Sequence, residues 1–180
     1  MKPVLFLDFD RTLFDTDKLY DWLGEERFQR ILALTGGAIP PPDFASYLYA
    51  DTLPFLKQIR NSYKLVLLTF AQNTKLQRMK VRGSGIVPLL DDVIITTGDV
   101  EGKTGKGDAI KNYFTRNQDS GWEHVFVDDT ADNLHEVKMI NPDVRIIRID
   151  RVPREHVVPL GSDVVPDTIV HNLVELERLL

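Results

Sequence analysis

The sequence of 180 residues contains no cysteine, which excludes disulfide bonds, thiolate catalysis and cysteine-ligated zinc or iron–sulfur centres. Basic residues are not in excess, because the formal net charge is -5, so nucleic acid is not an expected partner. No apolar run approaches the ~18 residues that a membrane-spanning helix needs, so no membrane partner is expected. The first residues lead directly into a strand-like segment that ends in acid, unlike a signal peptide. We therefore expect a protein of the cytoplasm.

Two carboxylates two residues apart follow this first strand-like segment. The apolar residues 3–7 lead into Asp8, and Asp10 comes two positions later. In extended backbone, side chains two positions apart project from the same side. Because carboxylates held that close repel each other, a cation between them is favoured, and Mg²⁺ takes hard oxygen ligands of this kind. On these residues alone, the alternative is an acid-rich turn that stops a strand.

Strand-like and helix-like segments alternate along the rest of the chain. Strands are expected at 3–7, 64–69, 93–96, 124–127 and 144–149, and helices at 18–34, 52–59, 73–81, 106–116, 132–140 and 167–180. Such alternation indicates βαβ units. The length of the chain favours one domain, or one domain with a small insertion. The sequence therefore predicts the α/β class, a three-layer Rossmann-like parallel sheet with a minimal helical insertion.

Polar residues gather where the predicted strands end. Acidic residues follow the first and fourth strands, Thr69 ends the second, and a loop with lysine and glycine, residues 102–107, follows the third. In a parallel sheet these positions share one edge, where ligands bind at the point of topological reversal. We expect the functional site at this edge.

The order of these features resembles the haloacid dehalogenase-like (HAD) superfamily of phosphohydrolases. Its first motif, Asp-x-Asp-x-Thr after a strand, is matched in DFDRTLFDT, and its Thr at the end of the next core strand is matched in KLVLLTF. Its acidic pair after an apolar strand is matched in VFVDDTADNL, after a lysine that opens a helix. The resemblance covers the chain apart from an insertion at 18–49. It implies a catalytic core of residues 1–17 and 50–180, with residues 18–49 as a small helical cap.

The resemblance also implies a reaction and its residues. Asp8 would be the nucleophile that forms an aspartyl-phosphate, and Asp10 the acid that protonates the leaving alkoxide and then deprotonates water. HAD-like dehalogenases lack this second acid, so its presence favours a phosphatase. Thr69 would donate to a phosphoryl oxygen, and a lysine would pair with the phosphate and Asp8. Lys106 fits the motif of the family better than Lys103, although both are available.

A magnesium site is the cofactor that the resemblance implies. An oxygen of Asp8, the backbone carbonyl of Asp10 and a carboxylate of the later acidic pair would hold Mg²⁺. In relatives with such a pair the second acid usually binds the metal directly, so Asp129 is preferred, with Asp128 acting through water. Asp132 is interpreted instead as the N-cap of the following helix.

Two features leave the substrate open. Arg11 stands where the family usually has glycine, and a side chain at this position bears on the geometry of the loop and on the fit of the substrate. The insertion is rich in aromatic residues, which we interpret as packing against the core rather than as a substrate entrance; they are Trp22, Phe28, Phe44, Tyr47 and Tyr49. So small a cap predicts either a bulky substrate, including a phosphoprotein, or a phosphorylated small molecule whose pocket another subunit completes. A non-catalytic phosphate- or partner-binding protein on the same fold is the alternative function.

Overall fold

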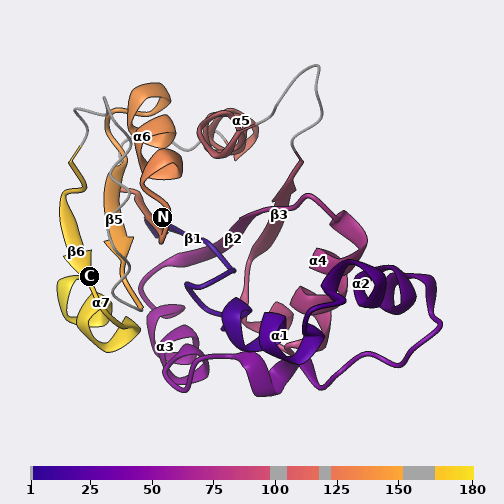
Figure 1. Cartoon of the computed structure of the whole chain (residues 1–180). Coiled ribbons are helices and arrows are strands. Elements are labelled where there is room, and N and C mark those ends of the chain that lie inside the picture. Colours follow the sequence, from indigo (N-terminus) through magenta and orange to yellow (C-terminus); the bar gives the residue numbers. More distant parts are fainter. Residues whose placement is uncertain (1, 98–104, 118–122, 152–164) are drawn as a thin grey trace.

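Six parallel strands form a single sheet in the order β3-β2-β1-β4-β5-β6 (Figure 1). The strands are β1 (Val4–Leu7), β2 (Lys64–Phe70), β3 (Asp92–Thr96), β4 (Val125–Asp128), β5 (Arg145–Ile149) and β6 (Thr168–Val170). The computed structural model describes residues 2–97, 105–117, 123–151 and 165–180. The predicted parallel α/β sheet is confirmed.

Strand β1 lies in the interior of the sheet and pairs on both sides. Leu5 is in register with Leu65 of β2 on one side and with Val125 of β4 on the other. All four residues of β1 are buried, as are Leu65–Leu68 in β2. This explains their continuous apolar sequence, because a strand covered on both faces has no solvent side for polar residues.

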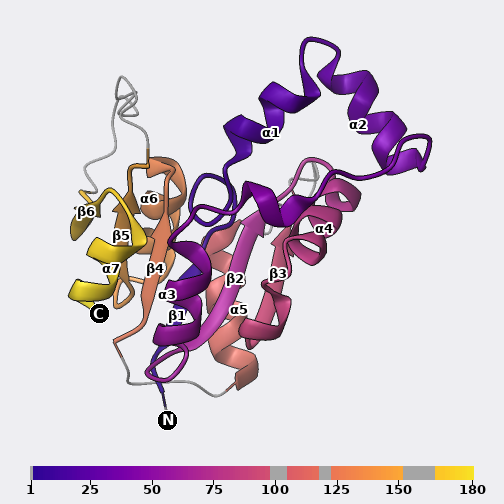
Figure 2. The same ribbon diagram turned by 90° about the horizontal axis from the view of Figure 1, so that it is seen from below.

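Helices cover both faces of the sheet (Figure 2). One face carries α3 (Thr52–Ile59), α4 (Thr74–Gly83) and α7 (Leu173–Leu179), and the other carries α5 (Lys106–Asn117) and α6 (Ala131–Ile140). Successive residues of β1 alternate between the two resulting cores: Leu5 packs with the first group and Phe6 with the second. The three predicted layers are therefore present.

The insertion forms two helices where the sequence predicted one over 18–34. They are α1 (Thr16–Leu23) and α2 (Arg27–Gly36). Gly24, at the end of α1, has a φ of 65°, a left-handed backbone conformation that breaks the helix there. The helical pattern in the sequence is thus real, but it belongs to two short amphipathic helices. The division into a core and a cap at residues 17 and 50 stays a prediction.

Of the five aromatic residues predicted to pack against the core, Tyr49 is half-buried, and the other four divide into two pairs. Phe44 and Tyr47, in a short 3-10 helix (Phe44–Tyr47), are buried, and the ring of Tyr47 stacks on Phe14 with centroids 5.7 Å apart. Trp22 and Phe28 are instead 39% and 70% exposed. The expectation that these aromatic residues pack against the core is correct for the first pair and wrong for the second.

The predicted helix over 167–180 begins later than expected. The first residues of the predicted helix form strand β6 instead, and these β-branched residues pair in parallel with β5. Asn172 then caps α7, with its side chain accepting a hydrogen bond from the backbone of Glu175. Within the described residues, every helix is too short or too polar to cross a bilayer.

Candidate active site

The predicted site residues at the ends of β1 and β4 meet at the topological switch point of the sheet, between the strands where the order of strand addition reverses. The chain builds β1, β2 and β3 to one side and then returns to place β4 beside β1. Asp8 follows directly after β1, and Asp128 is the last residue of β4. The carboxyl ends of strands that flank such a reversal form the usual binding crevice of α/β sheets.

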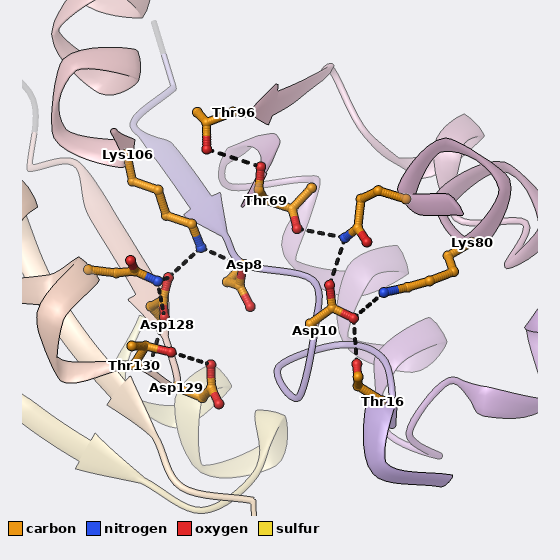
Figure 3. A network of polar contacts seen from close by, with 12 residues as sticks. Asp8, Asp10, Thr16, Thr69, Lys80, Thr96, Lys106, Asp128, Asp129 and Thr130 are labelled. Carbon is orange, nitrogen blue, oxygen red and sulfur yellow. Dashed lines mark hydrogen bonds and ion pairs between the residues drawn. The ribbon is translucent and has the colours of Figure 1, made fainter. Parts of the chain in front are cut away.

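Lys106 lies between these two carboxylates (Figure 3). Its Nζ atom is 2.5 Å from Oδ1 of Asp8 and 2.6 Å from Oδ2 of Asp128, and its side chain is 3% exposed. Lys106 is the first residue of α5, so the start of this helix delivers the cation to the strand ends. The structure thus places Lys106 at the site, while Lys103 lies outside the described residues.

The pKa values of both members of this pair are raised, that of Asp8 chiefly by burial and that of Lys106 by the charges beside it. Burial raises the pKa of Asp8 well above its usual value, and although Lys106 opposes the shift, the nearby carboxylate of Asp128 adds to it. Burial alone would lower the pKa of Lys106, but the charges of Asp128 and Asp8 outweigh it and raise the pKa above the ordinary value. Lys106 is therefore a permanent cation.

The two acids after β4 have different surroundings. Asp128 is completely buried, and protein donors engage both of its oxygens. Oδ1 accepts from the backbone N–H of Thr130 at 2.8 Å, and the side-chain amide of Asn133 donates to both oxygens at 3.0 Å. Asp129 is only partly buried and accepts from the hydroxyl of Thr130 at 3.1 Å. The assignment of Asp129 as the direct metal ligand, with Asp128 in support, stays a prediction.

Three carboxylates at this edge can hold a divalent cation. One oxygen each of Asp8, Asp128 and Asp129 lie within 4.8 Å of one another. A set of hard oxygen donors suits Mg²⁺ rather than a softer metal. The residues therefore fit the predicted cofactor.

Asp132 is not the N-cap of the helix that follows. The N-cap position belongs to Thr130, and Asp132 lies in the first turn of α6. An acidic residue in the first turn still interacts favourably with the helix dipole. Because acidic residues are favoured both there and at the N-cap, the sequence alone did not distinguish the two positions. Asp132 is absent from the cluster of carboxylates that the described residues form.

Asp10 belongs to a second network, which the sequence did not reveal (Figure 3). Lys80 forms an ion pair with Oδ1 of Asp10, and the Thr16 hydroxyl donates to the same oxygen. The side-chain amide of Gln77 donates to Oδ2 at 2.7 Å. Burial would raise the pKa of Asp10, but the charge and hydrogen bond of Lys80 and the other two donors outweigh it, so the pKa is lowered. Asp10 is therefore an ionised carboxylate in this structure.

Thr69 joins this second network through Gln77. The Gln77 amide lies 2.8 Å from Oγ1 of Thr69, and both residues are buried. Neither Gln77 nor Lys80 was singled out from the sequence, although a signal was present. The apolar residues Leu76 and Val81 define the inward face of α4, and the two polar residues fall on that face.

Arg11 adopts a backbone conformation that glycine reaches with less strain than other residues. Its φ is 61°, and it is the non-glycine residue with positive φ in the described chain. Its guanidinium donates to Asp17 at the start of α1, with Nη2 2.8 Å from Oδ1. The ion pair links the loop after β1 to the insertion, and offsets part of the cost of a left-handed conformation.

No protein-family model and no curated protein matches the sequence. Solved structures, in contrast, share the fold over nearly all of the chain. YfnB from Bacillus subtilis, described as a HAD-hydrolase and bound to magnesium, has a TM-score of 0.72 at 13% identity, covering 99% of this chain and 98% of its own.

Two further structures represent different chemistries on this fold. A HAD phosphatase from Thermococcus onnurineus has a TM-score of 0.64 at 21% identity, with 99% of this chain and 97% of that chain covered. The L-2-haloacid dehalogenase from Xanthobacter autotrophicus has a TM-score of 0.64 at 17% identity, with 99% and 98% covered. At these identities the comparison establishes that the chain has the HAD-like fold, and fold alone does not assign an activity.

Proposed function

We propose that this protein is a Mg²⁺-dependent phosphatase of the HAD superfamily, which hydrolyses a phosphate monoester through an aspartyl-phosphate intermediate. The observation that carries the proposal is the buried Lys106 between Asp8 and Asp128, with Asp129 beside them, where the sheet reverses. The HAD-like fold and the order of the sequence motifs support it.

In the first half-reaction an oxygen of Asp8 attacks the phosphorus atom, and the bond from phosphorus to the leaving oxygen breaks. Lys106 holds Asp8 in place and offsets negative charge beside it. Asp10 gives its proton to the leaving alkoxide. Because Asp10 is ionised in the free protein, it has to take up this proton from solvent, and the negative charge of the arriving phosphate favours that uptake by raising the pKa of Asp10.

In the second half-reaction water attacks the phosphorus of the aspartyl-phosphate. Asp10, again a carboxylate, accepts a proton from this water, and the bond from phosphorus to the Asp8 oxygen breaks. Inorganic phosphate leaves and the Asp8 carboxylate is regenerated. The ion pair with Lys80 favours the carboxylate form that this step requires. Thr69 and Lys106 would bind phosphoryl oxygens in both steps.

Asp8, Asp129 and the backbone carbonyl of Asp10 would hold Mg²⁺, with Asp128 in support. When bound, the ion supplies positive charge that reduces repulsion between the nucleophile and the phosphate. The substrate is a phosphorylated small molecule or a phosphoprotein. Location in the cytoplasm stays a prediction from the sequence.

Two other functions are possible on this fold, and both have a test. A dehalogenase is disfavoured because Asp10 is present and held by three donors. A non-catalytic binding protein is disfavoured because the predicted nucleophile, acid and lysine all occur together at one edge of the sheet.

The proposal is tested with p-nitrophenyl phosphate in Mg²⁺ and in EDTA, using wild type, Asp8→Asn and Asp10→Asn. We expect turnover only for wild type with Mg²⁺. Asp132→Asn, which alters an exposed acid in the first turn of α6 outside the carboxylate cluster, is the matched control and should retain activity. Turnover that persists in EDTA or in Asp8→Asn contradicts the mechanism. Halide release from a 2-haloacid would favour the dehalogenase, and inactivity over a broad panel the binding protein.

A further inference from the structure

We propose that Gln77 is a positioning residue that fixes the hydroxyl of Thr69 as a hydrogen-bond donor to the substrate phosphoryl group and ties it to Asp10. The inference deepens the proposed function and rests on it. It concerns a residue of α4 that no motif of the sequence indicated. Gln77 acts through its two partners and has no role in bond making.

The amide group of Gln77 stands between the two residues. Its Nε2 atom lies 2.7 Å from Oδ2 of Asp10 and 2.8 Å from Oγ1 of Thr69. Gln77 is 4% exposed, so bulk water does not compete for these bonds. Lys80, one helical turn further along α4, holds the other oxygen of Asp10.

The chemistry of the partners fixes the direction of both bonds. A carboxylate paired with lysine accepts hydrogen bonds and has none to donate, so the NH₂ group of Gln77 must face Asp10. The same nitrogen has no capacity to accept, and therefore it donates to Thr69 as well. Its two hydrogens are then both used, which leaves the amide with one orientation.

This direction determines what the Thr69 hydroxyl does. Because Oγ1 accepts from Gln77, its own proton has to be donated elsewhere. Within the described part of the chain, no acceptor takes that proton, and the nearby hydroxyl of Thr96 contacts only the backbone carbonyl of Thr69, at 3.4 Å. A phosphoryl oxygen bound beside Asp8 is an acceptor of the required kind. Gln77 thus pre-orients Thr69 before the substrate arrives.

The identity of the residue matters for this role. A methionine at position 77 has nearly the same size but donates to neither partner. A glutamate has the same shape, yet its carboxylate accepts the proton of Thr69 and repels Asp10. Both substitutions therefore remove the positioning role proposed for Gln77, while they change the volume of the buried side chain little.

The test compares kcat and KM for p-nitrophenyl phosphate with Mg²⁺ in wild type, Gln77→Met, Gln77→Glu, Thr69→Val and the double variant Thr69→Val/Gln77→Met. We expect each single change at Gln77 to lower kcat by about 10- to 100-fold with a smaller change in KM, as for other residues that orient a functional group. Gln29→Met, an exposed glutamine of α2, is the matched control and should have wild-type kinetics.

The double variant separates positioning from a general structural role. If Gln77 acts through Thr69, the loss caused by Gln77→Met is smaller in the Thr69→Val background than in wild type. Losses that multiply overturn this inference, and so does an unchanged kcat in both Gln77→Met and Gln77→Glu. Turnover by wild type leaves the proposed function intact in either case. Wild type without turnover on a broad panel of phosphate esters contradicts the proposed function first, and the inference with it.

Discussion

Lys106 and Asp8, 98 residues apart in the sequence, form an ion pair in which neither side chain is more than 6% exposed. A buried pair of this kind is not a general source of stability, because taking both charges out of water costs about as much as their attraction returns. Its importance lies in what happens when one partner is removed. The other charge is then buried without compensation.

We therefore predict that Lys106→Met lowers the free energy of unfolding by about 3–5 kcal/mol, because Asp8 and Asp128 lose the cation between them. Urea denaturation measures the change. Lys111→Met, an exposed lysine of the same helix, should change it by no more than about 0.5 kcal/mol. Equal stabilities for the two variants would mean that the carboxylates are not held as charges.

In the absence of metal, Asp8→Asn should raise the free energy of unfolding, in contrast to Lys106→Met. Because burial raises the pKa of Asp8, the folded protein binds its proton more tightly than the unfolded chain does. The free energy of unfolding therefore falls as the pH rises from 3.8 through the higher pKa of the folded state. Asparagine avoids this loss, and Lys106 still keeps Asp128 as a partner.

The measurement is the melting temperature in EDTA and in Mg²⁺ at several pH values. We expect Asp8→Asn to melt about 2–4 °C above wild type in EDTA at pH 8, corresponding to about 1 kcal/mol, with the difference shrinking toward pH 4. Mg²⁺ should raise the melting temperature of wild type more than that of the variant. The exposed Asp132→Asn is the control, and a pH-independent difference would argue against the raised pKa.

Gly107→Ala should destabilise the protein by about 1–3 kcal/mol through overpacking. A Cβ at this position would lie 2.8 Å from Cδ1 of Ile140 and 3.0 Å from the backbone oxygen of Glu136, so the Ile140 side chain and the backbone of α6 beside it would have to shift. Since Gly107 follows Lys106, activity should fall as well. Gly36→Ala, where a Cβ meets no atom within 4 Å, is the matched control in a chemical denaturation series.

At position 11 we expect the glycine variant to be more stable than the alanine variant, the reverse of the usual order inside a helix. Both Arg11→Ala and Arg11→Gly lose the ion pair with Asp17, but only glycine adopts the φ of 61° without strain. We expect the glycine variant to be more stable than the alanine variant by about 1 kcal/mol. At exposed Lys57, inside α3, the alanine variant should be the more stable by a similar amount. The same order at both positions would contradict a left-handed Arg11.

The sequence predicted the parts of the site that depend on strands. Continuous apolar runs in the sequence identified β1, β2 and β4. Because parallel strands bring their carboxyl ends to one edge, the sequence was enough to place Asp8, Thr69 and Asp128 at that edge of the sheet. Helix α3 was predicted to the residue, because its apolar residues and the proline of its first turn fit a single helix.

Features that depend on tertiary contacts were missed. In the sequence Lys80 is an ordinary lysine of a helix, and its ion pair with Asp10 depends on how α4 packs beside the loop after β1. Strand β6 has only three residues, and it is a strand because β5 offers an edge to pair with. The break at Gly24 was also missed, since the apolar spacing continues across it and glycine alone does not stop a helix.

The position of β1 between β2 and β4 has a consequence for protein synthesis. Val125, one of the two neighbours of Leu5, is synthesised only after the chain has grown by a further 120 residues. Until then β1 has one free edge, and pairing over such long stretches of chain is slow to form. An N-terminal fragment that stops before β4 would expose this apolar edge to other chains, so we expect truncated products to aggregate rather than to fold into a smaller enzyme.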